Sequence, residues 1–150
     1  PKVKCLLSAT HGEGFGLPIF EAAYNGLPII APAWSGHVDF LYMPKKDKSG
    51  KVKNKAMFSK VDYNLSPIPQ EVVWDGVLQA DSMWCNPKES SLKLKMKDMV
   101  DNWDRHNKRA QDLKSYVLEN FSQEKQYKAF TDSILAVVEA PQEDELVEFD

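Results

Sequence analysis

The sequence predicts an α/β fold: a parallel sheet with helices, followed by a helical C-terminal region. Two continuous apolar runs, residues 3–8 and 27–31, have the length of strands and lack the alternation of a half-exposed strand. A short helical segment lies between them, and a second follows the second run. This order of strand, loop and helix is typical of a partial Rossmann-like parallel sheet with right-handed crossovers.

The first apolar run, from Val3 to Ser8, is expected to be a strand buried on both faces. The segment from Ser8 to Gly16 then forms a glycine-rich loop at the carboxyl end of that strand. In open α/β sheets ligands bind outside the carboxyl ends of the strands. The glycines let backbone amides approach a ligand, and the helix that follows presents a positive N-terminus that suits phosphate.

The helix after this loop is predicted to run from Pro18 to Asn25. Proline suits a first helical position, and Gly26 suits the left-handed residue that ends a helix. Apolar side chains cover most of the helix circumference, so the helix is expected to be largely buried. Glu21 is the exception, and a carboxylate in such a helix needs a partner or a ligand.

A second glycine turn, Ser35-Gly36-His37, follows the second strand and leads into a short helix. The pair Gly14 and Gly16 alone is a weak motif. The dinucleotide fingerprint requires a third glycine three residues later, where this chain has Ile19. A nicotinamide-dependent enzyme is therefore disfavoured.

The segment from His11 to Ala22 reads HGEGFGLPIFEA, with Glu13 and Glu21 separated by seven residues. It resembles the E-x7-E signature of retaining glycosyltransferases with the GT-B fold, glycosyl transferases group 1 (family 4-like). The resemblance continues through AYNGLPIIAP, residues 23–32, and through the second glycine turn. It covers residues 6–41, and beyond them only a general pattern of C-terminal helices fits.

The resemblance implies a role for each matching residue. Glu13 would bond the hydroxyls of the transferred sugar and stabilise the transition state, and Glu21 would bond the ribose of the nucleotide. The backbone amides of Gly14, Phe15, Gly16 and Leu17 would face the donor sugar and its phosphates. His11 is a further candidate for donor contact. The fold of this family needs no metal and no other cofactor.

The resemblance also implies that this chain is a C-terminal piece of a longer enzyme. Residues 1–138 would form the latter part of the nucleotide-sugar domain, with residues 44–84 as an insertion. The acceptor-binding domain and the cations that bind pyrophosphate would lie upstream, so the isolated chain is expected to be inactive. A truncated sheet would expose an edge strand, through which we expect a homodimer.

Composition excludes several classes of protein. The net charge of −3 argues against strong nucleic-acid affinity, and no apolar run reaches 18 residues. The two cysteines have no metal-ligand spacing, which favours free thiols in a reducing cytoplasm. Residues 45–60 hold seven lysines. The favoured interpretation of this segment is a solvated loop. The second is a patch that faces an anionic membrane or a charged acceptor, and the least favoured is a nucleic-acid contact.

The remaining segments are predicted from local patterns. Residues 56–63 and 72–74 are expected to be strands, and Asn86 is expected to cap a helix with Pro87 at its first position. Further helices are predicted at 105–120 and from Ser122 onwards. Trp74 and Trp84 are expected in the core. The acidic segment 139–150 is expected to be disordered.

The leading functional hypothesis is retaining transfer of a hexose from a UDP- or GDP-sugar to a sugar or lipid-linked acceptor, by a cytoplasmic enzyme that can associate with a membrane. Two alternatives stay open. One is a nucleotide-sugar epimerase of the same fold, and the other is a non-catalytic binding or assembly module.

Overall fold

The computed structural model describes residues 3–138, so the predicted acidic tail lies outside the described residues. At the centre is a three-stranded parallel sheet of β1 (Leu6–Leu7), β2 (Ile29–Pro32) and β5 (Ser59–Val61), in the order β1-β2-β5. The chain is therefore a mixed α/β protein with a small parallel sheet, as the apolar runs predict.

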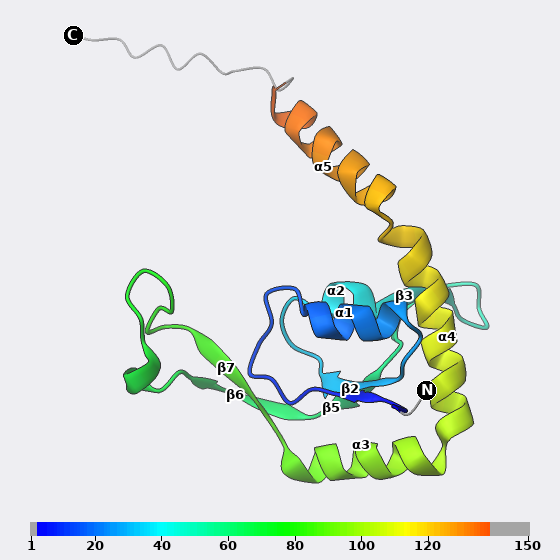
Figure 1. Cartoon of the computed structure of the whole chain (residues 1–150), viewed down its shortest axis with the longest axis horizontal. Coiled ribbons are helices and arrows are strands. Elements are labelled where there is room, and N and C mark those ends of the chain that lie inside the picture. Colours follow the sequence, from blue (N-terminus) through cyan, green and yellow to red (C-terminus); the bar gives the residue numbers. More distant parts are fainter. Residues whose placement is uncertain (1–2, 139–150) are drawn as a thin grey trace.

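Helices lie on both faces of this sheet (Figure 1). Helices α1 (Leu17–Tyr24) and α2 (Val38–Leu41) cover one face, and α3 (Glu89–Asp101) covers the other. Helix α4 (Trp103–Asn120) runs across the side of these layers. Because β1 and β2 pair in parallel, their carboxyl ends lie together at one edge of the sheet.

The central strand β2 explains why the sequence shows no alternation here. All four of its residues are buried. Successive side chains of a strand point to opposite faces. Ile29 and Ala31 accordingly pack in the core under α1 and α2, whereas Ile30 packs with Met99 of α3. A strand buried on both faces needs apolar residues at every position.

The first strand is shorter and more exposed than the sequence predicts. Only Leu6 and Leu7 pair with β2, and β1 is an edge strand in the described part of the chain. Val3 is 59% exposed and Leu7 is 38% exposed. The prediction of a strand buried on both faces from Val3 to Ser8 was therefore wrong for β1, because no strand among the described residues pairs with its outer edge and Leu7 faces an open cavity beside α3.

Two antiparallel hairpins extend from the sheet. One joins β3 (Tyr42–Lys46) to β4 (Val52–Ala56), and the other joins β6 (Tyr63–Pro67) to β7 (Met83–Pro87). The single strand predicted at 56–63 is thus divided among three strands. Residue 56 is the last of β4, residues 59–61 form β5, and residue 63 is the first of β6. Alternation of apolar residues cannot reveal where a strand changes its partner.

The segment between β6 and β7 contradicts a further expectation. Residues 70–72 form a short 3-10 helix, Gln70–Val72, and Trp74 makes only an isolated bridge to Leu78. Trp74 is 68% exposed and so lies outside the core. Pro67 and Pro69 precede this segment, and proline cannot donate a ladder hydrogen bond.

The C-terminal half is helical, with one boundary displaced. Asn86 and Pro87 belong to β7 and not to a helix cap, because they pair with β6. Helix α3 therefore begins at Glu89, three residues after the predicted cap. The predicted cap at Ser122 is confirmed, since its Oγ accepts a hydrogen bond from the Lys125 amide at 3.3 Å.

The last helix, α5 (Gln123–Val138), projects away from the rest of the molecule (Figure 1). None of its described residues is buried. Its apolar stripe is exposed throughout, with these members: Tyr127, Phe130, Ile134, Leu135 and Val138. No helix in the described part of the chain is both long enough and apolar enough to span a membrane.

Candidate functional site

The loops that follow β1 and β2 are joined to each other at the carboxyl edge of the sheet. The Ser35 hydroxyl accepts a hydrogen bond from the Glu13 amide at 2.6 Å and donates one to the Glu13 carbonyl at 2.8 Å. The Gly36 amide donates to the same carbonyl at 3.0 Å. Three hydrogen bonds therefore fix the backbone of Glu13, and its side chain is free for other contacts.

The two loops touch so closely that only glycine fits at the contact. A Cβ atom at Gly36 would lie 1.8 Å from the carbonyl oxygen of Gly14, far inside contact distance. Ser35 beside it has a left-handed φ of 70°, which is uncommon for a residue with a side chain. Strain of this kind persists where the surrounding contacts impose it, and it gathers at ligand sites.

The start of α1 has unpaired amides. Its N-cap residue is Gly16, with a φ of 83° and no side chain to cap the helix. The hydrogen-bond ladder begins at the Phe20 amide, which donates to the Gly16 carbonyl at 2.9 Å. Among the described residues, no acceptor is hydrogen-bonded to the amides of these five: Gly14, Phe15, Gly16, Leu17 and Ile19. Such a helix end is suited to an anion.

The two glutamates of the motif differ in their surroundings. Glu13 is half-buried in the loop, whereas Glu21 is exposed on α1. In the described part of the chain neither carboxylate makes a hydrogen bond or an ion pair. The expectation that α1 is largely buried was wrong, because only Ile19, Ala22 and Ala23 are buried. Glu21 therefore needs no protein partner, and water or a ligand can solvate it.

His11 is tied to the β6–β7 hairpin. Its Nδ1 lies 2.8 Å from the Cys85 carbonyl, to which it can only donate, and its own carbonyl accepts from the Cys85 amide at 2.9 Å. Its ring stacks on Trp84 with 4.6 Å between the ring centres. The glycine loop is thus supported by a hairpin more than seventy residues away, a contact for which local sequence patterns give no signal.

His37 is fully buried beneath the second loop. Its Nε2 lies 2.8 Å from the Pro32 carbonyl, so this nitrogen carries the proton and donates. Nδ1 is then an acceptor, and it has no hydrogen-bond partner among the described residues. The Cβ atom of His37 also lies 3.0 Å from the position that a Cβ atom on Gly16 would occupy. His37 therefore lies directly against the start of α1 with one unsatisfied acceptor.

The other predicted loop residues have packing roles or are exposed. Phe15 packs against Phe20 and Phe40, with ring centres 5.3 and 5.2 Å away, so its side chain has a packing role in the loop. Leu17 is 64% exposed. Trp34 is half-buried beside Tyr63, at 6.1 Å between ring centres.

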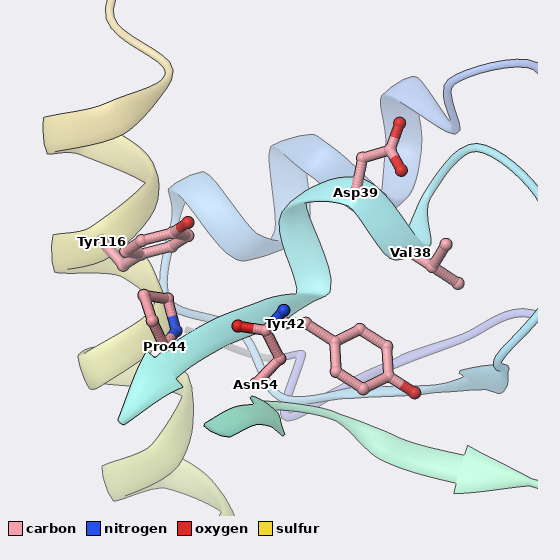
Figure 2. A pocket seen from close by; sticks show the side chains of 6 residues that line it. All are labelled: Val38, Asp39, Tyr42, Pro44, Asn54 and Tyr116. Carbon is pink, nitrogen blue, oxygen red and sulfur yellow. The ribbon is translucent and has the colours of Figure 1, made fainter. Parts of the chain in front are cut away.

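A separate cavity of about 590 Å³ lies between α2, the β3–β4 hairpin and α4. Its lining includes Asp39, Tyr42 and Tyr116, and none of the loop residues predicted to bind a ligand. Figure 2 shows that the Asp39 carboxylate and the Tyr42 ring point in different directions. Because the polar groups do not converge, this cavity lacks the arrangement that fixes a ligand.

Comparison with protein-family models, curated proteins and solved structures finds no significant match to this chain.

Proposed function

We propose that this chain supplies the donor-binding loop of a retaining glycosyltransferase with a GT-B fold. Its partial Rossmann-like sheet would hold a UDP- or GDP-hexose at the carboxyl edge, for transfer to an acceptor hydroxyl. The proposal combines the E-x7-E resemblance with the geometry of the two joined loops. The acceptor domain would be supplied by another part of the enzyme.

The observation that carries the proposal is the row of unpaired amides from Gly14 to Ile19 at the uncapped start of α1. A diphosphate placed there would receive amide hydrogen bonds and the favourable end of the helix dipole. The hydrogen bonds that join Ser35 and Gly36 to the backbone of Glu13 would preorganise this row, so that ligand binding need not order the loop.

Glu13 and Glu21 would contact two different parts of the donor. The Glu21 carboxylate, exposed on α1, is free to accept hydrogen bonds from a ribose diol. Glu13, with its backbone fixed and its carboxylate unpaired, would accept from sugar hydroxyls and stabilise positive charge developing on the sugar ring. A donor phosphate oxygen would take the proton of the acceptor hydroxyl, so Glu13 need not act as a base.

His37 is consistent with this arrangement. Its Cβ packs against Gly16, and its buried Nδ1 is an acceptor without a partner among the described residues, which costs free energy. The donor would lie on the outer side of the Glu13 loop, and both glycine turns would belong to one site because the second turn holds the first in place.

The test is calorimetric titration of the chain with UDP, GDP and their hexose conjugates. A UDP- or GDP-hexose is expected to bind, and Glu21→Gln is expected to weaken it about tenfold through loss of ribose hydrogen bonds. Glu124→Gln on the projecting helix α5 makes the same charge change away from the loops and should leave binding unchanged.

Other results would contradict the proposal. If Glu21→Gln and Glu124→Gln have equal effects, the nucleotide does not lie against α1. If no nucleotide sugar binds even to the full-length protein that contains this chain, the non-catalytic module is favoured. If the hexose of the donor is altered without any acceptor, the epimerase alternative is favoured.

A further inference from the structure

A second polar cluster lies at the amino end of β5, away from the loops that follow β1 and β2. A cavity of about 300 Å³ opens there between β5, α3 and α4. This volume is at the lower end of the range for small-molecule sites. Ser59 at the start of β5 and His106 of α4 are buried at its base. The sequence gives His106 no role, because it lies in a helix rich in polar residues.

The hydrogen bonds of His106 determine its tautomer. Nδ1 lies 2.9 Å from the Arg109 guanidinium and 3.2 Å from the Ser59 hydroxyl. A guanidinium can only donate, so Nδ1 is the acceptor and Nε2 carries the proton. Nε2 then donates to the Asp98 carboxylate at 2.8 Å. His106 is therefore neutral, and burial lowers its pKa, with the nearby Arg109 acting in the same direction.

The order Ser59, His106, Asp98 is that of a nucleophile, a base and an orienting acid. A catalytic role does not follow, because Arg109 donates to the same Nδ1 lone pair that would have to take the serine proton. The positive charge beside the ring also disfavours the imidazolium that such a base becomes. The cluster is instead built to hold the Arg109 guanidinium in one place.

Arg109 has no acidic partner in the described part of the chain. Its hydrogen bonds go to the neutral His106 ring and, at 3.5 Å, to the Ser59 hydroxyl. It is half-buried, and burial lowers its pKa, with the repulsion of Arg105 adding to the effect. A guanidinium has five N–H donors, so most of those on Arg109 lack a protein acceptor. A partly desolvated charge of this kind is stabilised by a bound anion.

The rest of the cavity is also positive. Lys60, Lys95 and Arg105 line it with Arg109, against the single carboxylate of Asp98. Asp98 is already held by Arg105 through two hydrogen bonds of 2.7 and 2.8 Å. Neither Lys60 nor Lys95 forms an ion pair with any described residue. This concentration of positive charge contrasts with the net charge of −3 of the whole chain.

We propose that this cavity binds the phosphate group of a small molecule, with Arg109 as its main ligand and Lys60, Lys95 and the Ser59 hydroxyl as further donors. Phosphate accepts paired hydrogen bonds from a guanidinium, and its double negative charge suits several cations around one cavity. Ala56 and Phe58 add apolar surface at the wall, against which a small organic substituent can pack. The site is independent of the proposed donor loop.

Calorimetric titration with inorganic phosphate, and separately with glycerol phosphate, tests the site. Arg109→Gln is expected to weaken phosphate binding at least about tenfold, because it removes charge-assisted hydrogen bonds. Lys108→Gln is the matched control: it removes one charge from the neighbouring position of α4, and Lys108 is exposed and outside the cavity lining. Tighter binding of glycerol phosphate identifies a phosphate ester as the ligand, and equal or tighter binding of inorganic phosphate identifies the free ion.

Lys95→Gln keeps the proposal testable if Arg109→Gln fails to fold, since Lys95 has no hydrogen bond or ion pair to lose among the described residues. It should weaken phosphate binding severalfold. Amide chemical shifts locate the ligand. The amide signals of Ser59, Lys60 and Arg109 should shift when phosphate is added, whether or not the signals at the start of α1 also shift. The proposal is overturned if phosphate does not bind, or if Lys108→Gln weakens phosphate binding as much as Arg109→Gln does. It is also overturned if phosphate shifts only the amides of residues 14–19, or if acetate binds the cavity as tightly as phosphate.

Discussion

The Ser35 hydroxyl bridges both backbone groups of Glu13, accepting from its amide at 2.6 Å and donating to its carbonyl at 2.8 Å. These residues come from loops after different strands and are brought together by the parallel pairing of β1 and β2. Through this contact, the shape of the first glycine loop depends on a single side chain of the second.

Ser35→Ala should remove both hydrogen bonds and retain the left-handed backbone strain. We expect a loss of about 1–3 kcal/mol in the free energy of unfolding, measured by urea denaturation. Ser35→Gly also loses the hydrogen bonds but relieves the strain at a φ of 70°, so its loss should be smaller. Equal stability of Ser35→Ala and the unchanged protein would show that the bridge does not support the loop.

Gly36→Ala should separate the two loops, because its Cβ would lie 1.8 Å from the Gly14 carbonyl oxygen. Backbone atoms cannot yield by rotating, so we expect a loss of more than about 2 kcal/mol in unfolding free energy, together with weaker donor binding. Gly12→Ala is the control in the same site, since its Cβ would lie an ordinary 3.7 Å from the Ser35 hydroxyl. If the two variants behave alike, close contact is not the reason for glycine at position 36.

The buried His106 should make stability depend on pH. Burial lowers its pKa below the ordinary histidine value of 6.5, and the positive charges of Arg109 and Arg105 act in the same direction, against the opposing effect of Asp98. The unfolded chain therefore binds a proton more readily than the folded one. Stability is fully present above pH 6.5 and is lost as the pH falls through the folded pKa.

His106→Gln should flatten this dependence between pH 7 and the folded pKa of the histidine, measured by thermal unfolding at constant ionic strength. Asp98 contributes at lower pH. Burial tends to raise its pKa, but hydrogen bonds from His106, Asn102 and Arg105 lower it below 3.8, so its contribution is lost only in more acidic solution. A slope near pH 6 that is the same in the variant would show that His106 is not its source.

Helix α5 should contribute little to the stability of the rest of the chain, because none of its described residues is buried. Ending the chain after Ser122 is expected to change the unfolding free energy by less than about 1 kcal/mol. Leu113→Ala in the core should cost about 2–5 kcal/mol and provides the scale for comparison. A large loss on truncation would mean that α5 packs on the body in solution.

The sequence was sufficient for the parts of the fold that local chemistry determines. The unbroken apolar run at 27–31 predicts a strand, found as β2, and Gly26, with a φ of 72°, ends α1 as expected. The turn at Ser35 and the short helix after it are also as predicted. In each case the residues that determine the element lie within it or next to it.

Long-range pairing limits such predictions. Asn86 and Pro87 carry the pattern of a helix start, and antiparallel pairing with β6 takes them into a strand. Local sequence patterns also gave no indication that Cys85 and Trp84 contact His11. For the candidate site, the motif indicated Glu13 and Glu21, but the bridge from Ser35 and the unsatisfied nitrogen of His37 depend on three-dimensional contacts.

The most direct test of the account is an amide chemical-shift titration of the ¹⁵N-labelled chain with UDP- and GDP-hexoses. We expect the largest shifts at the amides of Gly14, Phe15, Gly16, Leu17 and Ile19, and we expect Gly36→Ala to abolish them. Shifts that are absent, or that gather away from the start of α1 and persist in Gly36→Ala, would contradict a nucleotide-sugar site at the joined loops.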